Sequence, residues 1–301
     1  MNHRSIHQLA AVFAVAISLG FALAPTLRAD SFPPLNDPAT NLQIPGKFIW
    51  ADLFTNQPDT AATFYCGLFG WTSAPVEQHD KSYIILSNDG HPVAGVVQRS
   101  AESTKTEGVW VNYISVKKAK ATLKLVEPAG GELHASAHKF PNRGIQAIFT
   151  DSEGSVVGIL QSSSGDPLDN EPARGDWNWF ELFSLKPKAT ADFYGQVIGY
   201  DVSPDTRSEK SGHFLLSAAG HARAGVASLP ASPDSRSGWL GCVRVDNVDD
   251  AAAKAVTLGG TVVVPPRPAA LGSRFAVVTD PTGGAVGLVQ YVDNANPANR
   301  P

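Results

Sequence analysis

Apolar and polar residues follow one another in short runs that predict an ordered series of strands and helices. Residues 48–54, FIWADLF, are mostly apolar and predict a strand. Residues 58–68 place apolar side chains at helical spacing behind a proline in the first turn, where proline is well tolerated. The runs SYIILS (82–87) and VAGVVQ (93–98) predict two further strands, and the Asn-Asp-Gly turn between them favours a hairpin.

The stretch that follows has the same kind of pattern. Residues 109–116 predict a strand, and residues 117–131 predict a helix that ends at two glycines. Residues 145–151 and 155–161 predict a second hairpin. We therefore interpret the chain up to this point as two units of the form strand, helix and three strands. Residues 30–44 contain three prolines and no clear period, and we expect them to lie on the surface.

Most of this pattern occurs twice, at a nearly constant offset of 129 residues. The matched positions include Phe64-Tyr65 with Phe193-Tyr194, Trp110 with Trp239, Asp151 with Asp280, and the turn sequences GHPVAGV (90–96) and GHARAGV (220–226) at an offset of 130. An offset held over about a hundred residues predicts two copies of one domain, each of ordinary domain size. The expected organisation is a signal peptide (1–29), an N-terminal extension (30–44), domain 1 (45–165), a linker (166–176), domain 2 (177–293) and a tail (294–301).

The beginning of the chain predicts export. Arg4 precedes an uncharged apolar run at residues 9–24, and Leu27-Arg28-Ala29 follows as a cleavage site, which is the order of a secretory signal peptide. The run is short for a membrane-spanning helix, which needs about 20 residues, so an uncleaved anchor is the weaker alternative. We expect a secreted or periplasmic protein without membrane attachment after cleavage.

Charge and cysteine content limit the binding partners and the disulfides that we expect. Without residues 1–29 the chain has 22 basic and 28 acidic residues and no basic patch, so nucleic acid is not an expected partner. Cys66 and Cys242 lie in different halves. An oxidising compartment permits a disulfide between them, but two buried thiols are the simpler interpretation.

Two features give the chain a recognisable resemblance. One is the pair of endings DSEGSVVGILQ (151–161) and DPTGGAVGLVQ (280–290), and the other is the Phe-Tyr helix that follows each Trp-led strand. In these features the chain resembles the vicinal oxygen chelate superfamily of glyoxalases, bleomycin-resistance proteins and extradiol dioxygenases, and within it the tandem hydroxylase-like, glyoxalase-like group. The resemblance implies an α+β fold. Four βαβββ units would form two tandem domains, each an incomplete eight-stranded barrel around a ligand cavity.

Enzymes of that superfamily hold a divalent metal by His and Glu side chains on the cavity faces of the strands, and the metal acts as a Lewis acid. The resemblance places the corresponding positions at Trp50, Val111, Gly158, Trp179, Leu240 and Gly287. None of the residues at these six positions supplies a metal ligand, so we predict no metal and no other cofactor. His91 and His221 fall at hairpin turns, and His134 and His138 fall on an extended or loop stretch, so they do not restore a site.

Side-chain alternation along the strands predicts the residues that face each cavity. If Trp50 and Trp179 face inward, so do Asp52 and Glu181, while Ile49, Ala51 and Leu53 face the helix. The same alternation puts Val111, Tyr113 and Ser115 in one cavity and Leu240, Cys242 and Arg244 in the other. The predicted substrate-binding residues are Trp50, Asp52, Tyr113, Trp179, Glu181 and Arg244.

Two interpretations of the Trp–acid pairs stay open. An indole beside a carboxylate suits a cationic or polyhydroxylated small molecule, through stacking, cation–π contact and hydrogen bonds. Alternatively the Trp fills the space of the lost metal, and the acid pairs with a neighbour such as Arg244. An acid in an apolar cavity tends to have a raised pKa, which makes Glu181 the best general acid/base candidate if the protein is an enzyme.

The sequence therefore favours a metal-free, exported protein that binds a small organic molecule in one or both cavities, with no catalytic residue assigned. Three alternatives remain. The first is a metal-dependent lyase or dioxygenase. The second is a metal-free enzyme that uses Glu181 or Asp52 as general acid/base. The third is a non-catalytic, partner-binding protein whose cavities are filled by their own side chains.

Overall fold

A computed structural model describes residues 32–76, 83–99, 107–206, 212–232, 234–269 and 272–291. The predicted signal peptide and C-terminal tail lie outside these residues. Within them, no helix is long and apolar enough to cross a membrane.

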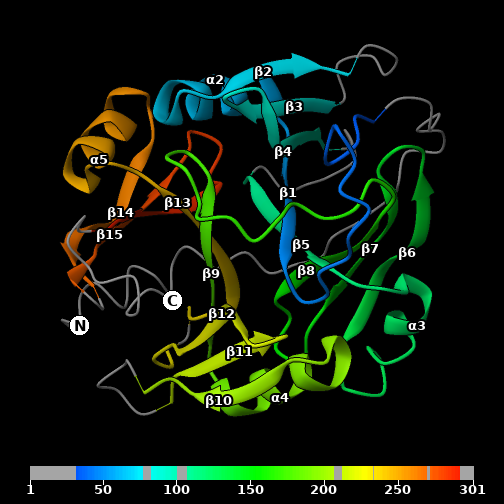
Figure 1. Cartoon of the computed structure of the whole chain (residues 1–301). Coiled ribbons are helices and arrows are strands. Elements are labelled where there is room, and N and C mark those ends of the chain that lie inside the picture. The colour runs from blue at the N-terminus through cyan, green and yellow to red at the C-terminus, as the bar shows by residue number, and fades with distance from the viewer. Residues whose placement is uncertain are drawn as a thin grey trace.

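The strands form two eight-stranded sheets, one from each copy of the repeat (Figure 1). Sheet A has the order β2-β3-β4-β1-β5-β8-β7-β6, and sheet B has the order β10-β11-β12-β9-β13-β16-β15-β14. The first copy contains β1 (Phe48–Thr55), α2 (Pro58–Phe69), β2 (Thr72–Pro75), β3 (Tyr83–Asn88), β4 (His91–Gln98), β5 (Val109–Ser115), α3 (Ala119–Leu123), β6 (Glu132–Phe140), β7 (Gly144–Thr150) and β8 (Val156–Ser162).

The second copy has the same order of elements. It contains β9 (Trp177–Ser184), α4 (Pro187–Ile198), β10 (Asp201–Pro204), β11 (Phe214–Ala218), β12 (His221–Ser228), β13 (Gly238–Arg244), α5 (Val248–Thr257), β14 (Thr261–Pro268), β15 (Arg274–Thr279) and β16 (Ala285–Gln290). In each sheet the two halves meet where β1 or β9 pairs antiparallel with β5 or β13. The two ends of each sheet remain separate, which confirms the predicted α+β architecture of incomplete barrels.

Each sheet has one face covered by helices and one face that we call the inner face. On β1, Ala51 and Leu53 belong to the helix-covered core, whereas Trp50 packs with Val111 and Tyr113 on the inner face. The alternation predicted from the sequence is therefore present from residue 50 onward. Ile49 was placed wrongly: the register between β1 and β5 shifts at this point, and a β-bulge turns Ile49 to the inner face.

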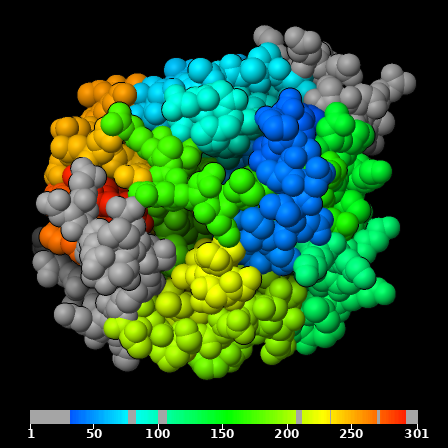
Figure 2. Space-filling model, viewed as in Figure 1, coloured from blue at the N-terminus to red at the C-terminus, as the bar shows by residue number. Residues whose placement is uncertain are grey.

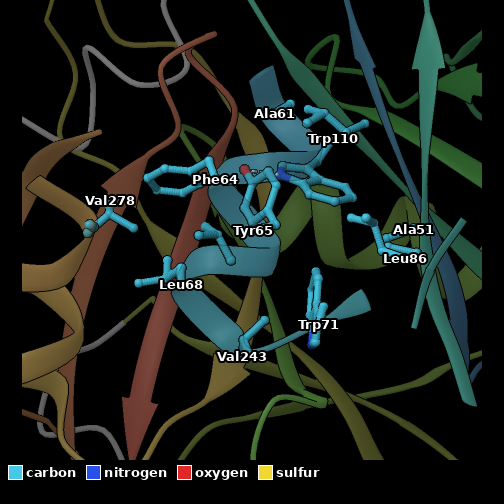
Figure 3. Close-up of a cluster of buried hydrophobic side chains, with 14 of the residues drawn as sticks. Ala51, Ala61, Phe64, Tyr65, Leu68, Trp71, Leu86, Trp110, Val243 and Val278 are labelled. Atoms are coloured by element: carbon cyan, nitrogen blue, oxygen red, sulfur yellow. Dashed lines mark hydrogen bonds between the residues drawn. The ribbon is translucent and has the colours of Figure 1, made fainter. Parts of the chain in front are cut away.

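Helix α2 shows how the two copies are held together. It ends at Gly70, whose φ of 80° lies in the left-handed region that glycine adopts readily. Figure 3 shows Tyr65 directed at Trp110 of sheet A, and Phe64 and Leu68 directed toward Val278 of sheet B. The Trp110 Nε1–H donates to the Tyr65 hydroxyl at 3.0 Å. The helix thus buries opposite sides against different sheets.

The hydrophobic cores of the helix-covered faces are shared between the copies. One core joins residues of β1, α2, β3 and β4 with residues of β13, α5, β15 and β16. The other joins residues of β5, α3, β7 and β8 with residues of β9, α4, β11 and β12. Each sheet therefore forms within one copy. On the helix-covered faces, the first of the four βαβββ units packs on the fourth, and the second packs on the third.

The predicted helix at 117–131 is mostly wrong. Only α3 is helical, and turns continue to Gly130. The side chain of Lys118, the residue before α3, makes no capping hydrogen bond, and Pro128 opposes helical geometry in the residue before it. In the second copy, the Asn247 side chain accepts two backbone N–H groups of the first turn, and α5 extends over ten residues. A side-chain cap thus distinguishes the longer of these two helices.

The N-terminal extension is not confined to the surface, contrary to the expectation. Phe32 and Leu35 are buried and join the apolar cluster on the inner face of sheet A. The end of the extension is held by the buried Asp166, which accepts hydrogen bonds from the Ile44 N–H and from the Ser115 hydroxyl. Figure 2 shows this N-terminal segment, in blue, between the cyan and green parts of the first copy. The extension therefore covers one side of sheet A.

Candidate functional site

The inner faces of the two sheets carry the same Trp–acid pair in the same strand register. Asp52 lies opposite Gly95 of β4, and Glu181 lies opposite Gly225 of β12. A Cβ atom on either glycine would collide with the carboxylate of its partner. Both acids therefore occupy space that an absent side chain leaves open, and both lie on the inner face as the alternation predicted.

In sheet A the pair belongs to a buried hydrogen-bonded cluster. Asp52 Oδ1 accepts from Trp50 Nε1 at 2.7 Å and from the Tyr83 hydroxyl at 2.7 Å. Trp50 Nε1 also lies 3.2 Å from the Tyr83 hydroxyl. Trp50 is 2 % exposed and Asp52 4 % exposed. The predicted site residues Trp50, Asp52 and Tyr113 are thus brought together, but their polar atoms are directed at one another.

Burial dominates the protonation of this cluster. It raises the pKa of Asp52, and hydrogen bonds from Tyr83 and Trp50 oppose the rise. Burial and the nearby Asp52 carboxylate together raise the pKa of Tyr83 and of Tyr113 well above the ordinary tyrosine value. The two phenols are therefore neutral hydrogen-bond donors at neutral pH.

A residue that the sequence analysis missed completes the cluster. Arg143, in the turn before β7, is 1 % exposed, and its guanidinium carbon lies 3.9 Å from the centre of the Trp50 ring. Among the described residues, none of its three side-chain nitrogens has a hydrogen-bond partner. Burial lowers the pKa of Arg143, while Tyr83 and Asp52 oppose that effect. The position has no match in the repeat, because Gly272 stands 129 residues later.

Phe32 covers this cluster from the N-terminal extension. Its ring packs edge-on against Tyr83 at 4.9 Å and against Phe140 at 5.4 Å, measured between ring centres. The guanidinium carbon of Arg143 lies 6.0 Å from the Phe32 ring centre. The inner face of sheet A is consequently filled by its own side chains and by the extension.

In sheet B the equivalent pair is more open. Trp179 Nε1 donates to Glu181 Oε2 at 2.7 Å, as in sheet A, but both residues are only partly buried. Cys242 takes the place of Tyr113 and is buried beside them. Burial, reinforced by the Glu181 carboxylate, raises the pKa of the Cys242 thiol, so the thiol is protonated and unreactive at neutral pH.

Arg244 lies at the end of the same face. Its Nη1 donates to the Pro172 carbonyl at 2.7 Å and to Glu171 at 3.1 Å, so its hydrogen bonds go to the linker and not to Glu181. Its guanidinium carbon lies 6.0 Å from the centre of the Tyr291 ring. Arg244 therefore joins the linker to the rim of sheet B.

The family assignment rests on comparison with known sequences. The sequence profile described as the glyoxalase/bleomycin resistance protein/dioxygenase superfamily matches residues 47–159 and 177–288, one match to each copy. The chain belongs to this superfamily. Both matches span the strands that carry the Trp–acid pairs, so the inner faces described above are those of two superfamily domains.

Individual relatives agree with the assignment. The chain is 30 % identical over 246 residues to a Mycobacterium tuberculosis protein, CFP32, named provisionally as a glyoxylase; the match covers 80 % of this chain and 93 % of the relative. It is 28 % identical over 261 residues to the anthracycline biosynthesis protein DnrV of Streptomyces peucetius, covering 82 % and 94 %.

Solved structures share the fold. An Mn(II)-bound glyoxalase from Novosphingobium aromaticivorans matches with a TM-score of 0.57 at 16 % identity, covering 86 % of this chain and 87 % of that one. The 2,3-dioxygenase LapB from Pseudomonas sp. KL28 matches with a TM-score of 0.57 at 12 % identity, covering 86 % and 97 %. At these identities the likeness concerns the fold alone.

The side chains of this superfamily member do not fit the metal that many superfamily enzymes use. Among the described residues there is no group of three or more His, Cys, Asp or Glu side chains placed to hold a metal ion. His91 instead binds Asp176 at 2.8 Å, and His134 lies 3.2 Å from the Thr150 hydroxyl. His138 packs edge-on against Phe140. These three histidines therefore have other partners in this structure.

Proposed function

We propose that this protein is exported and that it binds a small organic molecule, without a metal, on the inner face of sheet B between Trp179 and Glu181. One observation carries the proposal. The same Trp–acid pair is buried and capped in sheet A but only partly buried in sheet B. The partial exposure of the second pair supports binding there, while the first pair is covered by Phe32.

The chemistry of the pair favours a cationic or polyhydroxylated ligand with a flat face. The indole ring offers a surface for stacking and cation–π contact, which is worth about 0.5–2 kcal/mol depending on desolvation. The carboxylate of Glu181 offers charge-assisted hydrogen bonds at the edge of that ring. The Streptomyces relative is named for anthracycline biosynthesis, and anthracyclines are flat aromatic molecules of the kind that stack on an indole.

The partial exposure of Glu181 also keeps the metal-free enzyme as a second candidate. Glu181 is partly exposed, whereas Asp52 is buried and its Oδ1 accepts two hydrogen bonds. If the protein catalyses a reaction, Glu181 is its general acid/base. The metal-dependent lyase or dioxygenase would need ligands that the described residues do not bring together.

Calorimetric titration tests the proposal. Benzyltrimethylammonium supplies an aromatic ring and a cation, benzyl alcohol is the neutral comparison, and glucose represents polyols. We expect saturable binding of the cation, and Trp179→Ala to weaken it roughly 3- to 30-fold by removing the stacking surface. Glu181→Gln should reduce the preference for the cation over the alcohol.

Trp50→Phe is the matched control, because it changes the buried Trp of the other copy and should leave the titration unchanged. Circular dichroism and thermal unfolding establish whether each variant is folded. Loss of folding in Trp179→Ala would support the alternative in which the Trp is only a packing residue. Equal weakening by Trp50→Phe and Trp179→Ala would place the ligand elsewhere.

A further inference from the structure

The guanidinium of Arg143 has a charge and five N–H donors that the surrounding side chains do not use. It is almost completely buried, and none of its nitrogens has a hydrogen-bond partner among the described residues. Buried charges are normally paired and hydrogen-bonded, because removing them from water is costly. The Trp50 ring stabilises the cation through stacking at 3.9 Å but offers no hydrogen-bond acceptor in the ring plane of the guanidinium.

Asp52 is a candidate partner of opposite charge, but no hydrogen bond joins it to Arg143. Its Oδ1 already accepts from Trp50 and from Tyr83. The attraction between Asp52 and Arg143 is therefore electrostatic, without a direct hydrogen bond. A planar acceptor with two oxygens, such as a carboxylate, matches the forked donors of an arginine better than any group now beside it.

Phe32 indicates which group could accompany the carboxylate in a ligand. It comes from the N-terminal extension, outside the repeated domain, and its ring is enclosed by the edges of Tyr83 and Phe140. The same ring lies 6.0 Å from the guanidinium carbon of Arg143. The space that Phe32 fills thus has room for one six-membered aromatic ring, and the unpaired guanidinium lies over the face of that ring.

We propose that the inner face of sheet A is a second binding site, for a small aromatic carboxylate. Arg143 binds the carboxylate, and the ligand's ring uses the space that Phe32 fills in this structure, turned so that its carboxylate points at the guanidinium. Phe32 is then an internal competitor, and the extension must move for the ligand to enter. The proposal does not depend on ligand binding at Trp179.

The two inner faces would consequently select opposite charges. Sheet B has the partly buried Glu181, and Gly272 stands at the position matched to Arg143. Sheet A has the buried cation, while its acid is enclosed by hydrogen-bond donors. One duplicated frame thus holds a site for anions and a site for cations.

Calorimetric titration of the full mature chain with benzoate tests the second site, with benzamide as the neutral isostere and acetate as the anion without a ring. We expect Phe32→Ala to tighten benzoate binding at least tenfold relative to the unmodified protein, because it removes the competitor. Benzoate should bind Phe32→Ala at least tenfold more tightly than benzamide or acetate. Adding Arg143→Met to Phe32→Ala should abolish that preference, and adding Arg143→Lys should reduce it.

Trp179→Ala is the control that separates this proposal from the function proposed for sheet B, and it should leave benzoate binding unchanged. No saturable benzoate binding to folded Phe32→Ala would overturn the second site. Equal affinity of Phe32→Ala for benzoate and benzamide would overturn the role of Arg143, and this comparison holds even if the Arg143→Met variant does not fold.

Discussion

Sheet A and sheet B present the same two side chains in the same register to different surroundings. In sheet A, Trp50 and Asp52 are enclosed by Tyr83, Arg143 and the extension residue Phe32. In sheet B, Cys242 stands at the position of Tyr113 and Gly272 at that of Arg143, and the matched pair remains partly exposed. The comparison shows that the Trp–acid pair does not by itself have either a packing role or a ligand-binding role. Its role depends on what the rest of the chain places over it.

The largest difference between the two sheets is expected in the stability of their Trp variants. Trp50→Ala removes a fully buried indole and should lower the free energy of unfolding by about 3–5 kcal/mol. Trp179→Ala removes a partly exposed one and should cost roughly 1–2 kcal/mol. Urea unfolding followed by circular dichroism measures both. Equal losses would contradict the distinction between a closed and an open face.

A pH dependence should also distinguish the copies. Burial raises the pKa of Asp151 to about 6, above its unfolded value, so the folded protein retains a proton that the unfolded chain has lost. The contribution of Asp151 to stability is therefore full below about pH 4 and declines as the pH rises toward about 6, by roughly 2–3 kcal/mol. Urea unfolding from pH 4 to 7 should show this decline in the unmodified protein.

Asp151→Asn should reduce the decline, because the amide does not titrate, while Asp52 and Asp280, whose pKa values burial also raises, remain. The side chain can still accept the backbone N–H groups of Glu153 and Ser155 through its oxygen. Burial also raises the pKa of the matched Asp280, so Asp280→Asn is the comparison in the second copy. A pH profile that is the same before and after Asp151→Asn would show that other groups cause the dependence.

The glycines opposite the two acids offer a test of intermediate size. A Cβ at position 95 would collide with Tyr83 and Asp52, which hold each other by hydrogen bonds, so Gly95→Ala should cost about 1–3 kcal/mol. A Cβ at position 225 would meet only the flexible end of Glu181. Gly225→Ala should cost less, provided that Glu181 can turn toward solvent. Thermal unfolding of both variants measures the difference, and the opposite order would show that Glu181 is the more rigid acid.

The smallest expected effect is that of metal removal. Plasma mass spectrometry of protein expressed without a histidine tag should find close to no zinc, manganese, nickel or iron. Treatment with a chelator should change the melting temperature by less than about 1 °C, because a metal that does not bind cannot stabilise the folded state. One metal per domain, or a clear fall in melting temperature, would overturn the metal-free proposal for both sheets.

The sequence predicted the parts of the fold that depend on repetition and alternation. The offset of 129 residues led to two tandem domains, and strand parity placed Trp50, Asp52, Trp179 and Glu181 on the inner faces. The parity argument was wrong at Ile49, where a β-bulge adds one residue and reverses the facing. The helix expected at 117–131 was too long because apolar spacing alone does not supply a cap.

The residues that surround the candidate sites could not be predicted from the repeat or from strand alternation. Arg143 lies in a turn, and its contact with Trp50 joins residues 93 positions apart in the chain. Phe32 lies in a segment without period, and only the folded sheet gives it a place to insert. These two contacts close sheet A, and neither depends on the repeated pattern from which the candidate residues were derived.

The crosswise sharing of the two helix-covered cores also governs how the chain is assembled. The first of the four βαβββ units, which contains α2, packs its apolar side chains against α5 and β15 near the C-terminal end of the chain. A ribosome must therefore complete almost the entire polypeptide before α5 and β15 exist. The contacts that α2 makes with them join residues that lie far apart in the sequence. Such contacts slow folding, because a long loop has to close before they form. Cleavage within the linker would expose an apolar helix side on each fragment, so the halves are interdependent in biogenesis although each forms its own sheet.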